Sequence, residues 1–173
     1  MGKTPLIALI LGAVVVAIMS MVAIRFGGGT APAGAATTGE PAFVLESGEV
    51  RTPEDIGPAV IFIASAGCAH CHNLLARMAQ VQAQEGRAGA DRFYLFVLEG
   101  AEAGGVMKAQ NPLTGMHVVS STIDGMRHGQ SMGIRAVPTL IELDETGIER
   151  ARVTGDLRGA DLFTWMEKSG MVR

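Results

Sequence analysis

A continuous apolar run, AVIFIA at residues 59–64, leads directly to the two cysteines of the chain, Cys68 and Cys71. The run is rich in β-branched side chains and has turn-forming residues on both sides, which predicts a short strand buried on both faces. Apolar residues then recur at helical spacing between residues 74 and 81, up to about Gly86. Cys68 is therefore predicted at or just before the first turn of an amphipathic helix.

The run RFYLFVL at 92–98 has the same character and predicts a second buried strand. A strand, a helix and a second strand in this order form a unit that is normally parallel and right-handed. The next segment, 99–120, contains a glycine pair and a proline that break regular structure, so we interpret it as an insertion. Within it, residues 106–110 fit a helical turn and residues 116–120 fit a short strand.

The last third of the sequence predicts a helix, a hairpin and a final helix. Residues 121–124 have the S-x-x-D form of a capping box and precede a short helical segment. The strand predicted at 135–143 must have Pro138 at its start, because a proline inside a ladder would remove a hydrogen-bond donor. A turn leads to an edge strand at 148–153, and residues 161–168 form an amphipathic helix. The fold class is α/β.

The N-terminus is unlike the rest of the chain. Residues 6–24 carry no charge and nearly reach the roughly 20 residues that span a bilayer. A cleaved signal peptide is the alternative, because the small residues at 31–36 imitate a cleavage site, but its apolar core would be shorter. We interpret residues 1–26 as a single uncleaved anchor, and the small and polar residues at 27–41 as a flexible linker.

This organisation places one domain, residues 42–173, outside the cytoplasm. Lys3 precedes the apolar run and few basic residues follow it, a weak bias that keeps the N-terminus in the cytoplasm. The prediction is a single-pass protein of the bacterial inner membrane with its domain in the periplasm, where cysteines can form disulfides. A net charge of −3 without a basic run argues against nucleic acid as a partner.

The spacing of Cys68 and Cys71 has three chemical uses: a reversible dithiol, half of a metal site, or covalent haem attachment with His72. Haem-attaching domains of this kind are usually helical, whereas this motif follows a buried strand. A zinc site would need a second pair of ligands at finger spacing, which the sequence does not supply. The sequence therefore favours the dithiol, with no cofactor and no metal site.

The order of these segments resembles the thioredoxin fold, a central mixed sheet flanked by helices, over about residues 42–171. The segment CAHCHNLLARM is similar to the active-site helix start of bacterial periplasmic disulfide isomerases and oxidases, and AVPT resembles the cis-proline loop of the family. Two positions depart from the pattern. Phe62 stands where thioredoxins keep a buried acid that helps to move protons, and Gly67 replaces the usual tryptophan before the motif.

The resemblance implies a membrane-tethered periplasmic thiol:disulfide oxidoreductase acting on protein thiols and disulfides. Cys68 is the expected nucleophile, because a helix N-terminus stabilises its thiolate, and Cys71 is expected to be buried and to resolve the mixed disulfide. His70 can place a positive charge near the sulfur of Cys68. A cis Pro138 would leave the backbone of Val137 free to pair with an extended substrate.

Several functional questions stay open at this point. The resemblance implies a membrane redox partner that resets the cysteines, and the linker is too short for the dimerisation domain of periplasmic isomerases, so a monomeric oxidant is expected. A tethered thiol reductase in envelope-protein or cytochrome maturation, a haem protein and a non-catalytic envelope scaffold are the alternatives. Glu99 is interpreted as a solvated carboxylate at a strand end, and His117 and His128 as surface residues.

Overall fold

The computed structural model describes residues 41–86, 92–111 and 113–172. The predicted anchor and almost all of the predicted linker lie outside these residues. Within the described part of the chain, no helix combines the length and the apolar character needed to cross a membrane. In chain order the elements are β1 (Phe43–Leu45), β2 (Val50–Arg51), α2 (Pro53–Ile56), β3 (Ala59–Ala64), α3 (Ala69–Glu85), β4 (Phe93–Val97), α4 (Ala101–Gln110), β5 (Met116–Ser121), α5 (Gly125–Ser131), β6 (Thr139–Leu143), β7 (Glu149–Thr154) and α6 (Gly159–Lys168).

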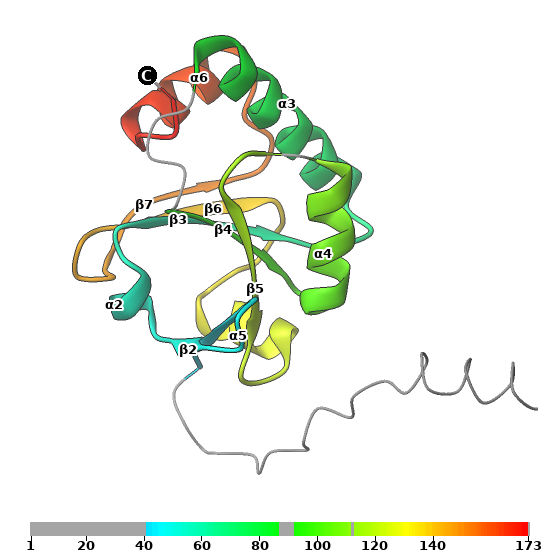
Figure 1. Cartoon of the computed structure of the whole chain (residues 1–173), viewed down its shortest axis with the longest axis vertical. Coiled ribbons are helices and arrows are strands. Elements are labelled where there is room, and N and C mark those ends of the chain that lie inside the picture. Colours follow the sequence, from blue (N-terminus) through cyan, green and yellow to red (C-terminus); the bar gives the residue numbers. More distant parts are fainter. Residues whose placement is uncertain (1–40, 87–91, 112, 173) are drawn as a thin grey trace, which may run out of the picture. The chain divides into compact units, whose positions relative to one another are not determined.

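One mixed sheet of seven strands runs through the described residues, in the order β2-β1-β5-β4-β3-β6-β7 (Figure 1). The strands β3, β4 and β5 are mutually parallel, whereas β6 and β7 on one side and β1 and β2 on the other are antiparallel to their neighbours. The predicted mixed sheet flanked by helices is confirmed. So are the buried strand before the cysteines, the parallel unit and the edge strand β7.

The interior strand β3 contributes to two layers of the core because its side chains alternate between the faces of the sheet. Phe62 and Ala64 face the core beneath α3, α4 and α6, whereas Ile61 and Ile63 face the side covered by α2 and α5 (Figure 1). All six residues of β3 are buried. Because complete burial of a large apolar side chain is worth about 1.5–3 kcal/mol, this strand anchors both layers.

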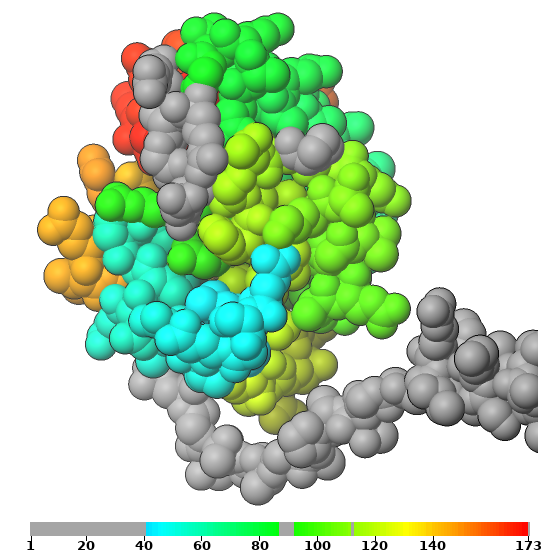
Figure 2. Space-filling view, in the orientation of Figure 1, coloured from blue at the N-terminus to red at the C-terminus, as the bar shows by residue number. Residues whose placement is uncertain are grey.

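The segment 99–120 supplies a helix and a strand. The helical turn predicted at 106–110 lies in α4, and the strand predicted at 116–120 lies in β5, which pairs with both β4 and β1. Figure 2 shows the β1–β2 segment, in cyan, against the yellow-green surface of this region. The glycine pair lies inside α4 and does not break it. A Cβ on Gly104 would lie 2.5 Å from Val118 Cγ1, so the glycine lets α4 pack closely on β5.

The start of α5 differs from the predicted capping box. Asp124 is the N-cap, and its carboxylate accepts the Arg127 N–H at 2.9 Å. Ser121 is the last residue of β5, and its hydroxyl instead accepts the N–H of Ile123 at 3.1 Å. The box over 121–124 is therefore wrong, because a short side chain one residue before the helix satisfies the free N–H directly.

Candidate active site

The carboxyl end of β3 delivers the cysteine pair. Ser65, Ala66 and Gly67 form a short loop, and the N–H of Cys68 donates to the Ser65 carbonyl at 3.0 Å. Cys68 is the N-cap of α3, as predicted, with extended backbone angles. The first turn of the helix therefore begins at the residue that carries the first sulfur.

The two cysteines form a disulfide, with 5.2 Å between their Cα atoms. Cys71 is completely buried, whereas Cys68 is partly exposed. The Sγ of Cys68 accepts the backbone N–H of Cys71 at 3.1 Å. This N–H is shared, because it also donates to the Cys68 carbonyl at 3.0 Å. A sulfur in this place faces the positive end of the helix dipole and a backbone N–H of the first turn, an environment that favours a thiolate.

The two histidines of the motif lie in different surroundings. His70 is exposed between the cysteines. His72 is partly buried, and its Nε2 lies 3.0 Å from the carbonyl oxygen of Ala66. The haem alternative would need this ring as an axial ligand and both cysteines as thioether links, whereas here the cysteines are joined to each other.

The proline loop lies beside the disulfide. The Val137-Pro138 peptide bond is cis, and the Val137 carbonyl oxygen lies 4.0 Å from the Sγ of Cys68. Pro138 is buried, whereas Val137 is partly exposed. The fold therefore brings together the cysteines and the two residues that were predicted to bind substrate. A second cis bond, Gly57-Pro58, precedes β3, and nothing in the sequence analysis pointed to it.

Glu99 makes contacts in this region that the sequence analysis did not predict. It lies just beyond β4, and its carboxylate accepts the hydroxyl of Ser65 at 2.5 Å and the N–H of Ala66 at 3.0 Å. Burial raises the pKa of the Glu99 carboxyl, but these hydrogen bonds outweigh it, so the pKa lies below its ordinary value. Glu99 is exposed, as predicted for a carboxylate at a strand end, and it also binds the loop before the cysteines.

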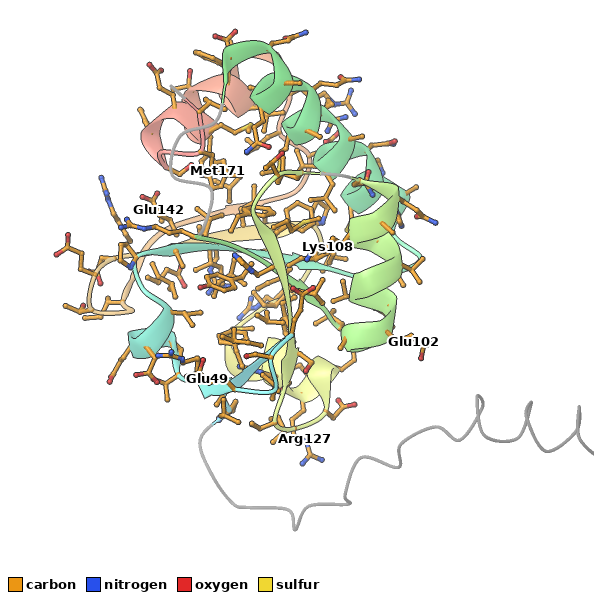
Figure 3. The ribbon with its side chains drawn as sticks, viewed as in Figure 1. Glu49, Glu102, Lys108, Arg127, Glu142 and Met171 are labelled. Carbon is orange, nitrogen blue, oxygen red and sulfur yellow. A yellow bond between two sulfur atoms is a disulfide. The ribbon has the colours of Figure 1, made fainter. Side chains whose placement is uncertain are left out.

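A groove of about 570 Å³ opens next to this loop, between the start of α3 and α4. His72, Glu99 and Glu102 line this groove. Figure 3 labels Glu102, which lies at the N-terminal end of α4. The position of Glu99 was available from the sequence, because it follows a strand parallel to the one that precedes the cysteines. Its partners were not, because both lie more than thirty residues earlier in the chain.

Three further residues that the sequence analysis singled out lie in the sheet or on α5. Phe62 is fully buried in the same core cluster as Cys71, so apolar atoms stand where thioredoxins place an acid. His117 lies on β5 with its ring near Tyr94. His128 is only 2% exposed, packed against aromatic rings of the core, so its predicted surface position is wrong. Desolvation lowers the pKa of His128.

Comparison with known proteins agrees with this geometry. A search of curated proteins gave no significant match. Solved structures with similar folds include a thio-disulfide isomerase from Thermus thermophilus, which is 17% identical with a TM-score of 0.59 over 76% of this chain and 93% of that one. DsbF of Mycobacterium tuberculosis is 16% identical, with a TM-score of 0.56 over 74% and 93%. A secreted disulfide oxidoreductase of the same bacterium is 14% identical, with a TM-score of 0.53 over 74% and 92%.

A family profile covers nearly the whole described domain. The profile of the thioredoxin-like domain matches residues 45–170, a range that includes the disulfide, the proline loop and all the elements from β2 to α6. The similar structures share the fold at low identity, whereas the profile match identifies the family directly. The chain belongs to the thioredoxin-like domain family, and with its Cys68–Cys71 pair it is a thiol–disulfide oxidoreductase of that type.

Proposed function

We propose that this oxidoreductase is tethered to the bacterial inner membrane, faces the periplasm and donates its disulfide to protein thiols. One observation carries the proposal: Cys68 is partly exposed at the N-terminus of α3, whereas Cys71 is completely buried. A disulfide with one accessible sulfur is attacked at that sulfur. The buried sulfur is then the leaving group within the protein.

The exchange proceeds in two balanced steps. A substrate thiolate attacks the Sγ of Cys68, a mixed disulfide forms, and Cys71 leaves as a thiolate that takes up a proton. A second substrate thiolate then attacks the substrate sulfur of the mixed disulfide and releases Cys68 as a thiolate. The substrate loses two electrons and two protons; the cysteine pair gains both electrons, Cys71 takes one proton and the other proton goes to the solvent.

His70 supports the direction of this transfer. Its side chain is exposed between the cysteines, and a positive charge there would stabilise the Cys68 thiolate. A couple whose reduced form is stabilised is the more oxidising one. The α3 N-terminus acts in the same sense in any protein of this fold, so we assign the distinguishing contribution to His70.

Val137 and Pro138 are the proposed substrate-binding residues. The Val137 carbonyl is 4.0 Å from the sulfur under attack, and proline has no N–H of its own to contribute. An extended substrate segment passing Cys68 would therefore pair with the backbone of Val137. This pairing recognises main chain, so it suits an enzyme that acts on many protein thiols.

The cellular setting rests on the sequence. Residues 6–24 are long enough to anchor the chain, and residues 27–41 are a suitable tether. A disulfide donor must be reset after each reaction, so we propose a redox partner in the same membrane and a monomeric mode of action. One similar solved structure is described as a secreted disulfide oxidoreductase, which fits an oxidising compartment.

The test is the redox potential of the Cys68–Cys71 couple, measured in glutathione buffers. We expect a value clearly less negative than the roughly −270 mV of thioredoxin, and a shift of about 30 mV to more negative potential in His70→Ala. His117→Ala, which removes a histidine on β5, is the control and should leave the potential unchanged. A potential at or below that of thioredoxin, unmoved by His70→Ala, would reject the oxidant and favour a tethered reductase.

A further inference from the structure

Two side chains from outside the loop, those of Glu99 and His72, hold the loop before Cys68 at Ser65 and Ala66. Ala66 donates its N–H to Glu99 Oε2 at 3.0 Å, and its carbonyl accepts from His72 Nε2 at 3.0 Å. The hydroxyl of Ser65 donates to the other carboxylate oxygen of Glu99 at 2.5 Å. Both polar groups of the Ala66 backbone are therefore bound to side chains of α3 and the end of β4.

Burial does not hold this loop. Ala66 and Gly67 are exposed, and a Cβ on Gly67 would meet nothing within 4 Å. A loop whose residues are largely exposed depends on its hydrogen bonds for a fixed conformation. The Glu99 carboxylate suits this task, because a charged acceptor makes stronger hydrogen bonds than a neutral one.

Further hydrogen bonds connect this loop to Cys68, the partly exposed cysteine. The N–H of Cys68 donates to the carbonyl of Ser65, and the carbonyl of Cys68 accepts from the backbone N–H of His72 at 3.2 Å. His72 thus bonds to Cys68 through its backbone and to Ala66 through its ring. The N-cap position of Cys68, on which the hydrogen bond from the Cys71 N–H to its sulfur depends, is set by a closed circuit that passes through Glu99.

We propose that Glu99 is a positioning residue for Cys68: by fixing Ser65 and Ala66, it keeps the sulfur at the N-terminus of α3, where the thiolate is stabilised. The inference rests on the proposed function, since it concerns the reactivity of the same cysteine. Glu99 acts on the position of Cys68 through the loop and not by binding either sulfur atom. We call Glu99 and His72 together the clamp, because Glu99 binds the N–H of Ala66 and His72 binds its carbonyl oxygen.

The direction in which the pKa of the Cys68 thiol shifts when Glu99 is replaced distinguishes a positioning role of Glu99 from a purely electrostatic one. Loss of the clamp would let Cys68 leave the helix N-terminus and so raise the pKa of its thiol. Loss of the negative charge of Glu99 alone would lower that pKa, because a nearby carboxylate opposes a thiolate. Glu99→Ala removes both the charge and the acceptor, whereas Glu99→Gln keeps an acceptor for the Ala66 N–H.

The experiment uses the reduced full-length chain and follows alkylation of Cys68 by iodoacetamide as a function of pH. In Glu99→Ala we expect the midpoint of the profile to rise by about one unit, which makes alkylation about tenfold slower below both midpoints. Glu99→Gln should stay at the wild-type midpoint or fall slightly below it. Glu102→Ala is the matched control, because Glu102 lines the same groove without bonding to the loop, and it should match the wild type.

A midpoint in Glu99→Ala that is unchanged or lowered would overturn the proposal, and so would an equal rise in Glu102→Ala. If circular dichroism shows that Glu99→Ala is unfolded, Ser65→Ala replaces it; a smaller rise supports the clamp, and no rise overturns it. The proposed function fails separately, in oxidised wild-type protein that does not transfer its disulfide to protein thiols. The comparison of alkylation midpoints stands whatever the direction of electron transfer.

Discussion

The two sulfur atoms of the site differ in accessibility although only two residues separate them in the sequence. Cys68 is partly exposed at the helix N-terminus, and Cys71 faces the apolar core one turn into the helix. Accessibility and thiolate character decide which thiol reacts first with a large substrate. At the scale of single residues, we therefore propose separate tasks for the two cysteines.

Replacing each cysteine by alanine tests this division. Cys71→Ala leaves the reactive thiol without its resolving partner, so mixed disulfides with other proteins should accumulate, at least about tenfold above those of Cys68→Ala. Non-reducing gels of acid-quenched cells measure these adducts. Equal trapping by the two variants would contradict the assignment.

At the scale of elements, α5 packs through a histidine on the face of the sheet that is opposite to α3, α4 and α6. The centroid of the His128 ring lies 4.8 Å from that of Phe43 on β1 and 5.2 Å from that of Phe96 on β4. Its Nδ1 is 2.8 Å from the hydroxyl oxygen of Ser121 on β5. Burial lowers the pKa of His128, because the charged ring would lose its hydration. The neutral ring is therefore part of the core.

This packing predicts a pH-dependent stability. Below about pH 6.5, His128 binds a proton in the unfolded chain but stays neutral in the folded domain. The free energy of unfolding should therefore fall with decreasing pH, by up to about 1.4 kcal/mol per pH unit. The fall should end at the pKa that His128 has in the folded domain. Urea titrations between pH 5 and 7.5 measure the slope. His128→Leu should reduce the slope, and His117→Leu, which changes a histidine of β5, should retain it. The same slope in His128→Leu would refute this origin.

The elements were predictable where local sequence decides. The apolar run at 59–64 became β3 residue for residue, and Cys68 became the N-cap of α3. Contacts between distant segments were not predictable, because a carboxylate or an imidazole has no local signature of its partner. The solvent exposure of Glu99 was therefore predicted but its bonds to the loop were not, and His128 was assigned to the surface although it is part of the core.

At the scale of the whole molecule, the proposed orientation predicts where the domain works. A reporter enzyme that is active only outside the cytoplasm, fused after Arg173, should be active, because the weak charge bias keeps the N-terminus inside. The full-length chain should sediment with membranes, and alkaline carbonate should not release it. A shorter form in the soluble fraction, cut near residues 31–36, would instead establish a cleaved signal peptide.

The cysteine content of the chain sets the stoichiometry of its chemistry. Both cysteines belong to the one disulfide, so the thiols of this chain can hold a single electron pair and have no second pair to which it could pass. Mixed with excess reduced protein and no oxidant, each molecule would deliver one disulfide and then stop. Its reaction would be a burst whose amplitude equals the amount of enzyme present. The rate of every further turnover would be set by the step that reoxidises the cysteine pair.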